Sequence, residues 1–141
     1  MKNKRIRYSF VDEVEVLERL NDNLDLFNRM IIKFKETYTK SDEEIAMLII
    51  QENYDDARII VHSIKGVARN LGIFKLALVA EKLEKLLLDR AKNELLMSCL
   101  VEFNNTLVEV LNEINKFEKD TVKEGEEWKR FWLLMMLLLL D

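Results

Sequence analysis

The sequence contains no proline and only three glycines among its 141 residues. Because proline and glycine punctuate sheets and turns, their scarcity favours an all-α protein. Apolar residues make up 49% and charged residues 34% of the chain, which predicts a globular domain with a real core rather than a disordered segment. The single cysteine, Cys99, cannot form an internal disulfide, and we expect a buried structural thiol because it falls on an apolar stripe.

Other absences narrow the function. The net charge of −4 argues against nucleic-acid binding, which requires a basic face. One histidine leaves no second imidazole for a zinc site, and no P-loop pattern is present, so we expect neither a bound cofactor nor autonomous use of ATP. The basic opening MKNKRIRYSF is not followed by an apolar core of a secretory signal, so we expect a cytoplasmic protein.

Apolar residues recur at helical spacing along most of the chain, which predicts an antiparallel helical bundle with short links. Ser41 and Glu44 have the spacing of a capping box, Asn53 is a candidate N-cap, and Gly72 fits the left-handed position after a helix end. The predicted helices cover residues 11–20, 24–38, 41–50, 54–71, 76–87 and 93–117. We therefore expect a helical domain over residues 1–120 and a separate extension over 121–141.

The extension begins with a charged break, EKDTVKEGEE, that contains Gly125, and residues 131–140 are then entirely apolar. A ten-residue helix is about 15 Å long, half of the roughly 30 Å hydrocarbon core of a bilayer, so this stretch is too short to span a membrane. We expect residues 128–140 to bury their apolar surface by self-association, most simply as a homodimer. Contact with a membrane surface and packing on the chain's own bundle are the alternatives.

The only histidine, His62, is predicted to point away from the core. At 100° per residue, one narrow sector of its helix collects the apolar side chains, and His62 lies about 150° from the centre of that sector. Arg58, Lys65 and Arg69 share the flank of the helix on which His62 lies. The apolar sector comprises Ala57, Ile60, Val61, Ile64, Ala68 and Leu71.

Gly66 follows His62 by one turn and has no packing role in this helix. A glycine inside a helix costs about 1 kcal/mol relative to alanine, so its position nearly opposite the core suggests that it clears space beside the imidazole. Ile59 also points outward and is a candidate docking contact. An imidazole that titrates near neutral pH is a good nucleophile, and cations at Lys65 and Arg69 could stabilise a phosphorylated ring. The pattern therefore indicates phosphoryl transfer with a large partner.

His62, Lys65, Gly66, Leu71 and Gly72 together resemble the motif of the histidine-containing phosphotransfer domain of two-component phosphorelays. The resemblance extends over residues 10–117, through LFNRMIIKFKETY before the histidine and LALVAEKLEKLL after it. It implies a four-helix bundle in which His62 accepts a phosphoryl group from a receiver-domain aspartate and passes it to another. It also implies that the receiver supplies magnesium and that Lys65 neutralises charge. Arg58, Ile59, Gly66 and Arg69 are the candidate partner-binding residues.

Three other functions share features with this sequence. The phosphoacceptor module of a chemotaxis-type histidine kinase shares much of the motif, although no catalytic domain accompanies it in this sequence. The dimerisation domain of a histidine kinase usually has an acidic residue after the histidine and a proline soon after, whereas Ser63 follows His62 here. A helical scaffold that binds partners without chemistry is the remaining alternative.

Overall fold

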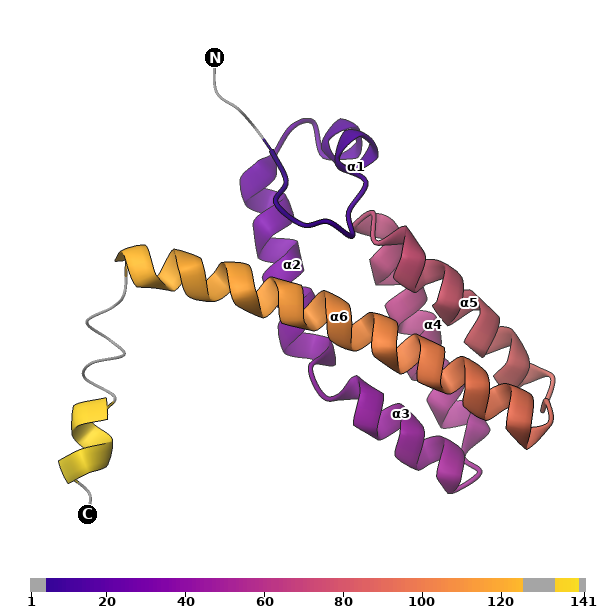
Figure 1. Ribbon diagram of the computed structural model, residues 1–141. Helices are drawn as coiled ribbons and strands as arrows, with labels where there is room; N and C mark the ends of the chain where they lie inside the picture. Colours follow the sequence, from indigo (N-terminus) through magenta and orange to yellow (C-terminus); the bar gives the residue numbers. More distant parts are fainter. Residues whose placement is uncertain (1–4, 126–133, 140–141) are drawn as a thin grey trace.

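The computed structural model describes residues 5–125 and 134–139, with side chains for 5–118 and 134–139. Six helices and no strand occur within residues 5–125, which confirms the all-α prediction. Figure 1 shows their arrangement along the chain. The helices are α1 (Glu13–Arg19), α2 (Leu24–Tyr38), α3 (Ser41–Ile50), α4 (Tyr54–Asn70), α5 (Phe74–Leu88) and α6 (Asn93–Gly125).

The helices form a bundle around one core. Helices α4 and α5 pack against each other as a hairpin, and the long helix α6 packs along α5 (Figure 1). Helices α2 and α3 both contact α6, and α3 also contacts α4, so these two helices close the remaining side. The short helix α1 lies beside the loop between α4 and α5 at one end of the bundle (Figure 1). This arrangement leaves the outer face of α4 free to carry a site.

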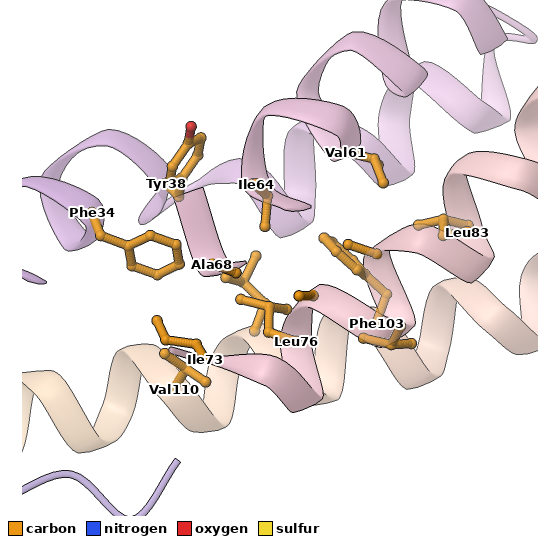
Figure 2. Packing of buried hydrophobic residues seen from close by; sticks show 14 of the residues in the cluster. Phe34, Tyr38, Val61, Ile64, Ala68, Ile73, Leu76, Leu83, Phe103 and Val110 are labelled. Carbon is orange, nitrogen blue, oxygen red and sulfur yellow. The ribbon is translucent and has the colours of Figure 1, made fainter. Parts of the chain in front are cut away.

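The core side of α4 is the one predicted from its periodicity. Val61, Ile64 and Ala68 are fully buried, and Figure 2 shows them directed at residues of α5 and α6 such as Leu83 and Phe103. Each fully buried aliphatic or aromatic side chain contributes about 1.5–3 kcal/mol by leaving water. This burial fixes the rotation of α4 about its axis, and therefore the direction of every side chain on its outer face.

Cys99 also lies in this core. Its side chain is buried and unpaired with another cysteine, as predicted. Burial raises the pKa of the Cys99 thiol, so it stays protonated and unreactive at neutral pH.

The C-terminal end of α4 is strongly determined. Gly72 has a φ of +74°, and a Cβ at that position would overlap Cγ2 of Val16 in α1, which confirms the predicted glycine stop. Arg19 then donates from Nη1 to the carbonyl oxygens of Arg69 (2.9 Å) and Asn70 (3.0 Å) in the last turn of α4, and the Arg69 carbonyl also accepts from the backbone amide of Gly72 (3.2 Å). The N-terminal segment therefore fixes the end of α4.

Two predicted N-caps behave differently from expectation. The capping box was wrong, because Ser41 is the first residue of α3 and is buried, while Lys40 occupies the cap position without a side-chain hydrogen bond. Asn53 does occupy the cap position of α4, but its side chain donates to Gln51 (3.5 Å) and does not cap the helix. In both places packing and the preceding turn, rather than a capping side chain, determine where the helix starts.

The last helix is longer than predicted. Helix α6 continues past Phe117 to Gly125, through most of the segment predicted as a charged break. Residues 118–124 contain neither glycine nor proline, and glutamate and lysine are good helix formers, so charge alone does not end the helix.

Part of the apolar stretch is described. Residues 134–139 are helical and their side chains are all exposed, whereas the rest of the predicted segment, residues 128–133 and Leu140, lies outside the described residues. Among the described residues, no helix is long and apolar enough to cross a membrane.

Candidate phosphoacceptor site on helix α4

His62 lies on the outer face of α4, and 64% of its side chain is exposed. Its Nδ1 atom is 2.6 Å from Oε2 of Glu84, which projects from the neighbouring helix α5. The imidazole is therefore anchored through one nitrogen while the ring remains open to solvent.

The anchor determines which nitrogen can react. Burial raises the pKa of Glu84, but hydrogen bonds and positive charge from Lys65 and His62 outweigh it, so the pKa lies below its ordinary value. Glu84 is then an ionised carboxylate at neutral pH and can only accept hydrogen bonds. Nδ1 must therefore carry the proton in the 2.6 Å contact, which leaves the lone pair of a neutral ring on Nε2.

Lys65 shares the same carboxylate. Its Nζ atom donates to Oε1 of Glu84 at 2.5 Å, and only 18% of the Lys65 side chain is exposed. One carboxylate thus binds the imidazole and the ammonium together, and it lies only 14% exposed between them. Lys65 was predicted to stabilise the charge of a phosphorylated ring, and the structure adds that its ammonium lies in a largely buried ion pair with Glu84.

Glu84 could not be identified as a site residue from the sequence. Its only signal is the Leu-Glu pair in the α5 segment LALVAEKLEKLL, and nothing in the spacing indicates which turn of α5 faces His62. That register depends on how α4 and α5 pack, which the structure supplies.

The other two cations of the predicted basic flank, Arg69 and Arg58, have different surroundings. Arg69 is paired with Glu81 of α5 at 3.1 Å, with about half of each side chain exposed. Arg58 is half-buried, and its Nε atom makes no hydrogen bond within the described part of the chain. Carboxylates of α5 therefore pair with two of the three cations of the basic flank, Lys65 and Arg69.

The space beside His62 is open, as the glycine predicted. A Cβ at Gly66 would meet no atom within 4 Å, and 62% of Ile59 is exposed on the same outer face. An apolar groove of about 410 Å³ runs next to this face between α2 and α4, and one of its walls is Val67, the residue after Gly66. The remaining lining residues are Leu26, Arg29, Met30, Lys33, Phe34, Thr37, Tyr38 and Leu71.

Tyr38 connects the groove to the histidine turn. Its hydroxyl lies 2.5 Å from Oγ of Ser63, the residue that follows His62. This contact and the Glu84 contact fix α4 from both sides, so the imidazole is presented on a rigid helix rather than on a loop.

No group of three or more histidine, cysteine, aspartate or glutamate residues in the described ranges is arranged to bind a metal ion. The site consists of groups from α4 and α5. His62 supplies an imidazole, Glu84 orients it, Lys65 places an ammonium nearby, and Gly66 leaves the approach open.

Comparison with known proteins agrees with this geometry. The comparisons with curated proteins and with solved structures gave no match. A family model described as the Hpt domain matches residues 10–117, which include every helix that forms the site. That match covers well over half of the chain, and the chain therefore belongs to the Hpt domain family of phosphocarriers in two-component signalling.

Proposed function

We propose that Nε2 of His62 accepts a phosphoryl group from an aspartyl phosphate on one receiver domain and passes it to the aspartate of another. Hpt domains act in two-component phosphotransfer and interact with receiver domains. The observation that carries the assignment to His62 is its exposed imidazole, bonded through Nδ1 to the ionised Glu84. We place this exchange in the cytoplasm, where the sequence predicts the chain.

The transfer needs no group other than these side chains and the receiver. The lone pair on Nε2 attacks phosphorus, the bond between phosphorus and the aspartate oxygen breaks, and the aspartate leaves as a carboxylate. The new bond leaves a positive charge on the ring, and the Nδ1 proton is shared with the Glu84 carboxylate, which stabilises that charge. Return transfer to a second aspartate reverses the same steps, and the magnesium ion belongs to the receiver.

Lys65 acts on the phosphoryl oxygens in this proposal. Its ammonium is already close to the imidazole through their common partner, Glu84. When the ring becomes phosphorylated, the added negative charge competes with Glu84 for Lys65, so the ammonium can shift toward the phosphoryl group with a short side-chain movement. Because it has a partner in both states, Lys65 is never left as an uncompensated half-buried charge.

The receiver approaches over Gly66. The absent side chain lets the partner's loops reach the imidazole, while Ile59 and the apolar groove between α2 and α4 supply the surface that becomes buried. Arg69 and Arg58 lie at the rim of this surface, where charges affect the rate of association more than the affinity.

The test is incubation of the chain with a panel of receiver domains carrying labelled aspartyl phosphate. We expect at least one receiver to transfer label to this chain in an acid-labile, alkali-stable form, as a phosphorylated imidazole requires. A scaffold would bind a receiver without gaining label. A kinase phosphoacceptor module would gain label only from a kinase catalytic domain with ATP, and either result would contradict the proposal.

A further inference from the structure

The described apolar helical segment, residues 134–139, has no polar face. Its six side chains are leucine or methionine, and their exposed fractions run from 45% at Met135 to 80% at Leu139. Successive residues in a helix are rotated by 100°, so six consecutive residues point in all directions around the axis. The segment therefore presents apolar surface on every side.

Apolar side chains on every side of the helix favour burial in a membrane over burial against a second copy of the chain. Association with a second copy buries one stripe on each helix and suits a segment whose opposite face is polar. Here the outward faces of a paired helix would still expose leucine and methionine to water. Hydrocarbon surrounds an inserted helix completely, so it covers all six side chains at once.

Length and flanking residues favour insertion into one side of a bilayer. The uninterrupted apolar run is bounded by Arg130 and Asp141 in the sequence, and its described helical part, residues 134–139, is about 9 Å long, less than a third of a hydrocarbon core of roughly 30 Å. Trp128, Lys129 and Trp132 stand at its start, and tryptophan and lysine are typical of the boundary between water and lipid. We propose that residues 134–139 insert into a single leaflet of a phospholipid membrane and attach the phosphotransfer domain to its surface.

This attachment does not depend on phosphotransfer and can be measured separately. The chain has two tryptophans; Trp128 precedes the apolar run and Trp132 lies within it, so intrinsic fluorescence reports directly on this region. The full chain is mixed with phosphatidylcholine vesicles and with vesicles that also contain phosphatidylglycerol, and binding is followed by co-sedimentation and by the tryptophan emission maximum.

The test variant is the full chain with Leu137→Glu and Leu138→Glu. Its matched control carries Leu78→Glu and Val101→Glu, which place the same charges at apolar positions of the bundle that are similarly exposed, 66% and 57%. We expect the unmodified chain and the control to sediment with vesicles and to shift their emission to shorter wavelength. The test variant should bind at least about tenfold more weakly, since two buried apolar contacts are replaced by charges.

Three results would overturn the proposal. The first is that the unmodified chain stays in the supernatant with both kinds of vesicle. The second is that the test variant binds as tightly as the control. The third is a dimer by light scattering without lipid that neither sediments with vesicles nor changes its emission, which would assign the apolar surface to a second copy.

Discussion

Replacing Glu84 by alanine tests whether one carboxylate organises the site. Glu84 accepts hydrogen bonds from Lys65 at 2.5 Å and His62 at 2.6 Å, and its side chain is only 14% exposed. A hydrogen bond to a charged group contributes about 1.5–3 kcal/mol. The contact between Lys65 and Glu84 is the more buried of the two. Glu84→Ala also leaves the Lys65 ammonium without its partner, so we expect the free energy of unfolding to fall by about 2–3 kcal/mol at pH 7 in urea denaturation.

The loss should depend on pH. The pKa of Glu84 in the folded protein lies below its ordinary value of 4.5, so its contribution to stability is present above that value and disappears as the pH falls through the folded pKa. The difference between the unmodified chain and Glu84→Ala should therefore be full at pH 7 and shrink at pH values below about 4.5.

Glu81→Ala is the matched control, since Glu81 lies on the same helix and pairs with Arg69. About half of each of these side chains is exposed, and such pairs contribute only about 0–1 kcal/mol. Both variants gain the same helix propensity from alanine, which therefore cancels in the comparison. Equal losses for the two variants, or a Glu84→Ala loss that does not change with pH, would refute the reasoning.

Five further substitutions test the approach to the imidazole and the end of α4. Gly66→Ala should raise the free energy of unfolding by about 0.5–1 kcal/mol, because alanine is the better helix former and its methyl group meets open space. Gly66→Leu should slow transfer by more than about tenfold by blocking the receiver. Normal transfer by Gly66→Leu would exclude the steric role. Lys65→Ala should lower the single-turnover transfer rate more than it lowers the affinity for the receiver. Ile59→Glu should lower the affinity measured by calorimetry more than it lowers the transfer rate. Equal effects on rate and affinity in both variants would contradict this division of roles. Gly72→Ala should destabilise the chain by at least about 2 kcal/mol in urea, because φ is +74° and the methyl group overlaps Val16; an unchanged midpoint would contradict this account.

The helices could be predicted from the sequence because their apolar residues recur at the helical period and therefore fall on one face of each helix. Val61, Ile64 and Ala68 determine the rotation of α4, and the exposure of His62 and Ile59 follows from that rotation. Gly72 was predictable for a different reason, since its backbone conformation is disfavoured for residues with a side chain. These features are local, so one sequence is enough to find them.

Features that depend on contacts between helices were missed or mistaken. Glu84 reaches His62 only because α4 and α5 pack in one particular register, and the same register pairs Arg69 with Glu81. The sequence alone does not show that carboxylates of α5 pair with Lys65 and Arg69 of the basic flank. The predicted end of α6 at Phe117 was wrong for a local reason, because the charged residues that follow it are good helix formers and continue the helix to Gly125.

The central claim is that His62 carries the phosphoryl group, and the most direct test compares the full chain with His62→Gln. Each protein is incubated with a labelled receiver domain that phosphorylates the unmodified chain, and the site of the label is determined by mass spectrometry under alkaline conditions. The account predicts label on His62 of the unmodified chain and none on the His62→Gln variant. That variant should remain folded, with a free energy of unfolding lower by no more than about 1.5–3 kcal/mol, the contribution of the hydrogen bond to the ionised Glu84. Undiminished labelling of a folded His62→Gln chain would contradict it.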